Sequence, residues 1–311
     1  MKFYPGELSS TYSIVARDPD TGQLGVAVQT HQMGVGRLVP WLLPGIGAVA
    51  TQSLVNISFG PMALTMLKEG VHAAHVIAAL AASDEGANRR QVAVVDGHGN
   101  AAAWTGQGCI AEAAHFVGEG YSVQANMMTH STVVAAMSTA YEKATGDLAL
   151  RMLAALQAAE SEGGDIRGMQ SAALVVVPGD KNVPEWRTDY DLRVDEHAAP
   201  LTELTRLVRL RHAQVADEAG YRALDEGDRD TALDRWQKAR REAPELEELA
   251  FWQAMKLADE HGDVQAAATI LRPVMARNTR RTHWIELIRR LQLCGLIERE
   301  NAGEELIAAL G

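Results

Sequence analysis

Two kinds of hydrophobic pattern alternate along the first two thirds of the chain. Runs rich in β-branched residues flank a turn of Asp, Pro and Gly at residues 18–22, which predicts a hairpin with strands over 11–17 and 25–30. Further strand-like runs, one of them built from small residues, predict strands over 45–52, 91–95, 101–105 and 171–177.

Helical patterns fall between these strands in pairs. Gly60-Pro61 begins a predicted helix that ends at Gly70, and the run over 71–82 is apolar on most faces, so we expect it to be buried. A second pair is predicted from apolar stripes that begin at Val133 and Leu148. Pairs of helices between antiparallel strands fit an α+β fold, a four-layer αββα sandwich with two sheets inside and helices outside.

The composition changes near Pro200. Residues 1–199 hold 12 Lys and Arg, whereas residues 200–311 hold 17 in little more than half that length and contain almost no strand-like runs. We therefore predict two domains, an αββα domain over 1–199 and an all-α domain over 200–311.

The helical domain contains an internal repeat with the spacing of a tetratricopeptide repeat (TPR). The first copy consists of Gly220, Tyr221, Gly227, Ala232, Ala239 and Pro244. A weaker copy, one residue out of register, consists of Ala254, Leu257, Gly262 and Ala267. The aromatic residues expected to fill gaps between the helices are Trp236, Phe251, Trp252 and Trp284. Two repeats are few for a free solenoid, so we expect contact with the first domain or a homo-oligomer.

Charge and composition limit the classes of partner. The net charge of -11 argues against a nucleic-acid-binding surface. The longest apolar stretch, over 71–82, is too short to span a bilayer, so no membrane partner is expected. Two cysteines, Cys109 and Cys294, do not make a disulfide framework, and with no targeting signal the cytoplasm is the default compartment.

The motifs of metal and nucleotide sites are missing from the sequence, so no cofactor and no metal is expected. His72 and His75 lie three residues apart on a predicted helix, but no nearby carboxylate completes a ligand set. Cys109 lies beyond a strand end, where the favoured role is that of a small buried hydrophobe.

Residues 163–171 form the densest polar cluster, in a glycine-rich loop before the last strand. Asp165 and Arg167 in this loop could hold an anionic or amide substrate, or could simply tie the loop down. His31 closes the second predicted strand and is a candidate base.

Several separate segments resemble, in order, the DUF1028 family of unknown function over roughly residues 8 to 195. The segments that carry the resemblance are 11–18, 45–52, 59–61, 90–96, 105–109 and 163–174. The family is placed among the N-terminal-nucleophile (Ntn) hydrolases, so the resemblance implies the αββα sandwich of that class.

In Ntn enzymes a Thr, Ser or Cys at a free N-terminus attacks an amide, and its own amine takes the proton. The resemblance implies Thr11 as the nucleophile, with Gln52 and Asn126 as donors to the oxyanion. Ala125 stands where the family usually has Gly. The residues expected to position a small-molecule substrate are His31, Asp165, Arg167, Gln170 and Ser171.

Ten residues, Met1 to Ser10, precede Thr11, so its nitrogen is a peptide nitrogen unless the chain is cut between Ser10 and Thr11. Three alternatives follow: an unprocessed precursor, a different mechanism, or a fold kept without the reaction. The first hypothesis is thus an Ntn-type hydrolase of an amide bond in a small molecule. The second is a catalytically silent binding or scaffold protein whose TPR-like repeats dock a protein partner. A third is a metal-dependent hydrolase that uses His31 and its neighbours.

Overall fold

The computed structural model describes residues 8–9, 11–277 and 279–311, with Leu8 and Ser9 described by their main chain. The chain divides into two compact units, Met1–Val208 and Arg209–Gly311. The division falls inside helix α5, Pro200–Asp225, which begins at the residue where the composition changes. The boundary at 199/200 stays a prediction.

The first unit contains a six-stranded antiparallel sheet in the order β11-β10-β3-β2-β9-β8. Its strands are β2 Thr11–Arg17, β3 Leu24–Thr30, β8 Ala114–Gly118, β9 Tyr121–Asn126, β10 Ser171–Val177 and β11 Tyr190–Val194. The predicted hairpin is present as β2 and β3. The turn between them is closed by the Asp18 carboxylate, which accepts a hydrogen bond from the Thr21 main-chain N–H at 2.8 Å.

A second, five-stranded antiparallel sheet has the order β1-β5-β6-β7, and β4 also pairs with β5. Its strands are β1 Leu8–Ser9, β4 Pro40–Leu43, β5 Gly47–Leu54, β6 Arg90–Asp96 and β7 Ala101–Thr105. The short strand β1 pairs with the end of β5, where Leu8 lies opposite Leu54 and Ser9 opposite Ser53. The chain therefore passes from the second sheet at β1 to the first sheet at β2.

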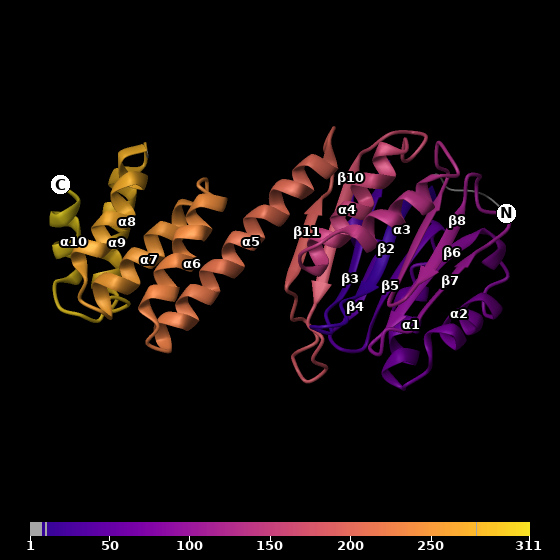
Figure 1. The fold of residues 1–311 in the computed structure, drawn as a ribbon, viewed down its shortest axis with the longest axis horizontal. Helices are drawn as coiled ribbons and strands as arrows, with labels where there is room; N and C mark the ends of the chain where they lie inside the picture. Colours follow the sequence, from indigo (N-terminus) through magenta and orange to yellow (C-terminus); the bar gives the residue numbers. More distant parts are fainter. Residues whose placement is uncertain (1–7, 10, 278) are drawn as a thin grey trace. The chain divides into compact units, whose positions relative to one another are not determined.

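Helices cover the outer face of each sheet in this unit (Figure 1). The helices on the five-stranded sheet are α1 Phe59–Lys68 and α2 Ala73–Ala82, and those on the six-stranded sheet are α3 Val133–Lys143 and α4 Leu148–Ser161. Short 3-10 helices cover Val35–Arg37 and Ala87–Arg89. Asp147 caps α4 by accepting a hydrogen bond from Leu150 N at 3.0 Å.

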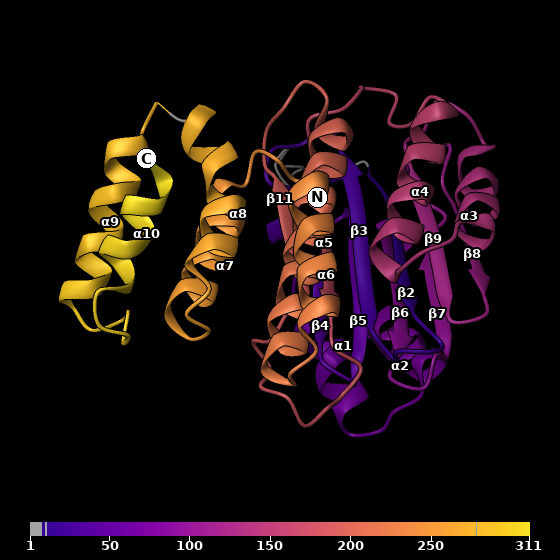
Figure 2. The ribbon, with the colours of Figure 1, turned by 60° about the vertical axis from the view of Figure 1, so that its left-hand side comes forward.

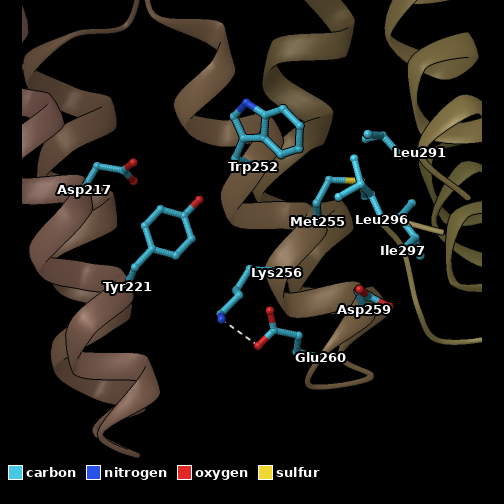
Figure 3. A pocket seen from close by; sticks show the side chains of 10 residues that line it. All are labelled: Asp217, Tyr221, Trp252, Met255, Lys256, Asp259, Glu260, Leu291, Leu296 and Ile297. Atoms are coloured by element: carbon cyan, nitrogen blue, oxygen red, sulfur yellow. Dashed lines mark ion pairs between the residues drawn. The ribbon is translucent and has the colours of Figure 1, made fainter. Parts of the chain in front are cut away.

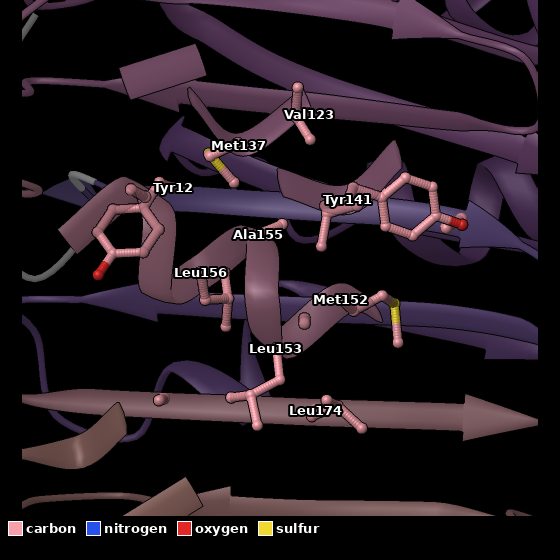
Figure 4. Packing of buried hydrophobic residues seen from close by; sticks show 14 of the residues in the cluster. Tyr12, Val123, Met137, Tyr141, Met152, Leu153, Ala155, Leu156 and Leu174 are labelled. Carbon is pink, nitrogen blue, oxygen red and sulfur yellow. The ribbon is translucent and has the colours of Figure 1, made fainter. Parts of the chain in front are cut away.

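Three hydrophobic clusters hold these layers together. The cluster between the sheets includes Val15, Val26 and Ala50, and a second cluster packs α1 and α2 on their sheet. The third lies under α3 and α4 and includes Met137 of α3, Leu156 of α4 and Leu174 of β10 (Figure 4). Successive side chains of a strand point to opposite faces, so each sheet places apolar side chains both between the sheets and under its helices.

The second unit consists of the C-terminal part of α5 and five further helices. These are α6 Arg229–Glu242, α7 Glu247–Asp259, α8 Val264–Arg277, α9 Arg281–Leu293 and α10 Ala302–Leu310. Figure 2 shows α7 beside α8 and α9 beside α10. A Cβ on Gly220 of α5 would come within 2.4 Å of Trp236 Cδ1, so only glycine lets the indole of Trp236 pack here.

The prediction that four aromatic residues fill the gaps between these helices is wrong for Trp252. Trp236 and Phe251 are fully buried, whereas Trp252 is 46% exposed because it follows Phe251 on α7 and faces away from the core that Phe251 enters.

The coarser fold prediction is confirmed: the protein combines antiparallel sheets and helices in its first part with a helical C-terminal region. Among the residues that the structure describes, no helix has the length and apolar character that crossing a membrane would require.

Candidate functional site

A row of four polar residues crosses the end of the six-stranded sheet. Thr11 of β2 lies opposite Asn126 of β9 on one side and Thr30 of β3 on the other, and Thr30 lies opposite Ser171 of β10. Residues directly opposite one another share a face, and all four are fully buried. Strand register therefore brings two predicted catalytic residues and one predicted substrate-binding residue into one line.

Gln52 reaches Thr11 from the other sheet. Its Nε2 donates to the main-chain carbonyl of Thr11 at 3.2 Å, and Nδ2 of Asn126 lies 3.5 Å from the same oxygen. The three residues predicted to be catalytic are thus in contact, with two amide donors directed at the first residue of β2.

Gln91 of β6 completes this cluster, and the sequence prediction missed it. Its Oε1 accepts hydrogen bonds from Gln52 Nε2 at 2.7 Å and from Asn126 Nδ2 at 3.0 Å. Its Nε2 donates to the carbonyls of Ala114 and Ala125 at 3.1 and 3.0 Å. Carbonyl oxygens only accept, so they fix which end of the Gln91 amide is nitrogen.

The polar cluster continues along the inner face of the sheet. Ser13 donates to Gln52 Oε1 at 2.5 Å and accepts from Gln124 Nε2 at 2.6 Å. Ser13, Gln124 and Asn126 are polar residues at alternate positions of buried strands. That alternation is the sequence signal that could have revealed an inward-facing polar site.

The glycine-rich loop before β10 holds a buried carboxylate. Asp165 is 3% exposed, and its oxygens accept from the His31 main-chain N–H at 3.0 Å and from Arg167 Nη2 at 3.0 Å. Gly168 adopts a φ of +98° in this loop, a conformation that glycine tolerates best. Predicted residues from two segments far apart in sequence therefore meet at the end of β3.

The remaining predicted residues make bonds that fix the same region. Ser171 Oγ donates to the carbonyl of Gln32 at 2.5 Å and accepts from Val35 N at 3.2 Å. The Gln170 main-chain N–H donates to the Thr30 carbonyl at 3.1 Å. The Nδ1 atom of His31 is buried and has no hydrogen-bond partner among the described residues.

The opposite face of β2 carries a second polar pair, formed by buried Tyr12 and half-buried Glu160. Tyr12 donates its hydroxyl proton to Glu160 Oε2 at 2.7 Å. Burial, and then the nearby Glu160 carboxylate, raises the pKa of Tyr12 well above its ordinary value. The phenol therefore stays neutral and acts as a donor.

The surroundings of Thr11 determine what the cluster can do. Thr11 is 0% exposed, and Ser10 and residues 1–7 lie outside the described residues, so the predicted cleavage point does too. In the described ranges, His, Cys, Asp and Glu side chains do not gather in groups of three that could hold a metal ion.

Comparisons with known proteins agree on one family. The sequence profile of DUF1028, a family of unknown function, matches residues 11–204. A crystal structure of protein SPO2555 from Silicibacter pomeroyi, described as a DUF1028 protein, is similar with a TM-score of 0.58 and 31% identity, over 64% of this chain and 88% of that chain. No curated protein matches the sequence.

Proposed function

The chain belongs to the DUF1028 family, and from that premise we propose that its first unit is an Ntn-type hydrolase of an amide bond in a small molecule. Thr11 is the proposed nucleophile. The observation that carries the proposal is the convergence of Gln52 Nε2 and Asn126 Nδ2 on the main chain of Thr11. Both amides are buried and held by other polar groups, as preorganised donors to an oxyanion need to be.

The layered arrangement of the first unit supports the same class. Two antiparallel sheets pack face to face, with a helix pair on each outer face, which is the architecture expected of an Ntn sandwich. Thr11 is the first residue of β2 and lies in the row of polar residues at one end of the sheet.

The proposed reaction requires a free amine on Thr11. That amine takes the proton from the hydroxyl, Oγ1 attacks the amide carbon, and the leaving amine receives the proton, which leaves an ester on Thr11. Water, deprotonated by the same Thr11 amine, then hydrolyses this ester, releases the acid and restores the hydroxyl. Gln52 and Asn126 then donate to the oxygen that gains charge. Because a peptide N–H cannot serve as the base, we propose that the chain with Met1–Ser10 attached is a precursor.

Removal of Met1–Ser10 would also change access to Thr11. Thr11 is fully buried, and β1, which lies within the segment to be removed, pairs with β5 at Leu54 and Ser53. Ser53 follows Gln52, so loss of β1 exposes main chain next to a proposed oxyanion donor. The substrate-positioning roles of His31, Asp165, Arg167, Gln170 and Ser171 belong to the same proposal.

The test compares the whole chain with a chain that begins Met-Thr11, from which removal of the initiator Met exposes Thr11. We expect the mature form to start at Thr11 by intact mass and to hydrolyse small amides. Thr11→Ala should abolish this activity, and Thr11→Ser should retain part of it. Thr65→Ala, in an exposed position of α1, is the matched control. Amidase activity that survives Thr11→Ala in a chain of full mass would refute Thr11 as nucleophile.

A second candidate function rests on a groove in the helical unit (Figure 3). Its volume is about 460 Å³, and it lies between α5, α7 and the end of α9. Its lining combines the exposed side chains of Trp252 and Leu296 with three carboxylates, Asp217, Asp259 and Glu260, against one cation, Lys256. We propose that this TPR-like unit binds a protein segment that carries an apolar side chain beside a basic one.

An array of synthetic octapeptides, probed with the whole protein, tests this second function. Sequences with Leu or Phe next to Arg or Lys should be enriched, because the groove offers apolar surface and excess negative charge. Trp252→Ala should remove the signal, whereas Trp186→Ala, at a 78% exposed position of the first unit, should leave it unchanged. Homo-oligomer formation through the helical unit is the alternative, and a loss of oligomer mass in Trp252→Ala would indicate it.

A further inference from the structure

A surface cleft of about 520 Å³ lies between the end of β7 and the start of β8. This volume is within the range of small-molecule sites. Its lining includes Thr105, Gln107, Cys109, Glu112 and His115. Among the described residues that line the cleft there is neither Lys nor Arg, so an anionic ligand would lack a partner.

Thr105 and His115 form a hydroxyl–imidazole pair in this cleft. Thr105 Oγ1 lies 2.8 Å from His115 Nδ1. On its other side, Thr105 Oγ1 accepts a hydrogen bond from Gln91 Nε2, also at 2.8 Å. Gln91 is the residue whose amide orientation is fixed by main-chain carbonyls, so its nitrogen, not its oxygen, faces Thr105.

The hydrogen bonds around Thr105 allow its proton to point at the imidazole. Gln91 supplies a donor to Oγ1, and in one of the two imidazole tautomers the hydroxyl donates its own hydrogen to His115 Nδ1. That arrangement requires a neutral imidazole with its hydrogen on Nε2. Partial desolvation lowers the pKa of His115, although the residue keeps solvent contact in β8, and this favours the neutral imidazole near pH 7. In the tautomer with its hydrogen on Nε2, the neutral ring accepts a proton from the hydroxyl.

We propose that Thr105 and His115 are a nucleophile–base pair that hydrolyses small uncharged acyl esters in this cleft. A hydroxyl held against a neutral imidazole acceptor is the arrangement that activates hydroxyl nucleophiles. An ester is the substrate class because its alkoxide leaves more readily than an amine and needs less assistance. This pair uses a different hydroxyl from that of Thr11 and does not need a free amine, so it operates in the uncleaved chain. Gln91 bonds both to Thr105 and to Asn126 of the Thr11 cluster.

The reaction balances without any further reactant except water. The Oγ1 lone pair of Thr105 bonds to the ester carbon, the carbonyl electron pair moves to its oxygen, and the hydroxyl proton passes to His115 Nδ1. Collapse breaks the bond to the alcohol, which leaves with that proton. Water, deprotonated by the same nitrogen, then releases the acid and restores the Thr105 hydroxyl.

The experiment uses the whole chain and a fluorophosphonate probe, which transfers its phosphonyl group to activated hydroxyls with loss of fluoride. Thr105 lies in the tryptic peptide 91–143, and Thr11 lies in 3–17, so peptide mass separates the two sites. Fragmentation separates Thr105 from Cys109 within the first peptide. We expect an adduct on Thr105 and turnover of p-nitrophenyl acetate.

Four variants make the test specific. Thr105→Val, which keeps the side-chain shape, should lower ester turnover about 100-fold and abolish the adduct, and His115→Gln should lower turnover by a similar factor. Thr105→Ser should retain both the adduct and turnover. His98→Gln, in the turn between β6 and β7, should match the unmodified chain.

Three results would overturn the proposal: an adduct on Thr11 or Cys109 in place of Thr105, no adduct at all, or turnover that persists in Thr105→Val and disappears in His115→Gln. The last would mean that the imidazole acts alone as the nucleophile. An adduct on Thr11 would also show that this hydroxyl reacts without a free amine. The other results do not bear on whether a cleaved chain that begins at Thr11 hydrolyses amides, so the two proposals fail separately.

Discussion

The side-chain nitrogen of Gln52 lies 3.2 Å from the main-chain oxygen of Thr11, and this hydrogen bond joins the two sheets at the end of the buried polar row. Gln52 also donates to Gln91 Oε1 and accepts from Ser13 Oγ. One amide therefore satisfies three buried polar groups. Interactions of this kind matter most when one partner is removed, because the groups left behind are still shielded from water.

We expect Gln52→Leu to lower the free energy of unfolding by about 2–4 kcal/mol, because Leu fills a similar volume but leaves these groups without a partner. Urea unfolding of the whole chain measures the change. Gln237→Leu, at an exposed position of α6, is the control and should change the free energy by less than about 0.5 kcal/mol. Equal midpoints for the two variants would show that the polar cluster contributes no net stability.

The pair formed by Asp165 and Arg167 gives a second prediction. Asp165 is buried, whereas the Arg167 side chain is 30% exposed, and the carboxylate also accepts from the His31 main chain. Asp165→Ala should lower the free energy of unfolding by about 1–3 kcal/mol, since the His31 main-chain N–H and the Arg167 guanidinium lose the acceptor that this carboxylate supplies. Amide exchange should become faster at 163–170 before global unfolding.

Asp20→Ala, at an exposed position in the β2–β3 turn, is the matched control for that experiment. It should leave exchange in the 163–170 loop unchanged. If Asp165→Ala leaves both stability and loop exchange unchanged, the pair does not tie the loop down, and its role would have to be sought in substrate binding alone.

Six strands, β2, β3, β5, β6, β7 and β10, were predictable because their small or β-branched residues, and the turn of Asp, Pro and Gly before β3, carry local signals. Strands β4, β8, β9 and β11 were not predicted, although β9 is a buried central strand. In β8 the residues are mostly exposed and mixed in character, and β11 alternates Asp and Arg with apolar residues at only five positions. Such strands are held by pairing with β9 and β10, which a local pattern does not report.

The candidate site was predictable only in part, and for a similar reason. Thr11, Gln52 and Asn126 follow from a family resemblance, and strand register brings them together. Gln91 was missed although it lies in a segment that carries the resemblance, because a single Gln at the start of a strand has no chemical signature. Trp252 shows the limit of composition: an aromatic residue in a helical hairpin is as able to line a groove as to fill a core.

The cluster under α3 and α4 predicts the effect of a deletion in the core. Leu156 of α4 is fully buried, whereas Leu150 of the same helix is 37% exposed. Figure 4 shows Leu156 among its neighbours. Leu156→Ala should lower the free energy of unfolding by about 3–5 kcal/mol through lost burial and the cavity it leaves. Leu150→Ala should change it by less than about 1 kcal/mol in the same urea titration. Similar losses would mean that the cluster relaxes to fill the cavity.

The last prediction concerns Asp217, a buried acid of the helical unit. Its carboxylate accepts a hydrogen bond from Gln253 Nε2 at 2.6 Å, and Arg240 in turn donates to Gln253 Oε1. Burial is the largest influence and raises the pKa of Asp217 to about 6 from an ordinary value of 3.8. Glu218 raises the pKa further, and the hydrogen bond from Gln253 lowers it.

A raised pKa means that the folded chain holds the proton of Asp217 more tightly than the unfolded chain does. Between pH 4 and pH 6 the folded state therefore binds more protons, and its stability falls as the pH rises, by up to about 3 kcal/mol from this group. Asp217→Asn removes the titration but keeps an oxygen that can accept from Gln253. The stability of this variant relative to the unmodified chain should therefore increase from pH 4 to pH 6.5 and then stay constant.

Urea unfolding across that pH range measures the difference between the two chains, in which the titrations they share cancel. Asp234→Asn, at an exposed position of α6, is the control and should differ from the unmodified chain by a constant amount at every pH. A constant difference for Asp217→Asn as well would mean that the Asp217 carboxylate is solvated in the folded state. The groove that Asp217 lines would then present a charge that water already stabilises, and its attraction for a basic partner would be weak.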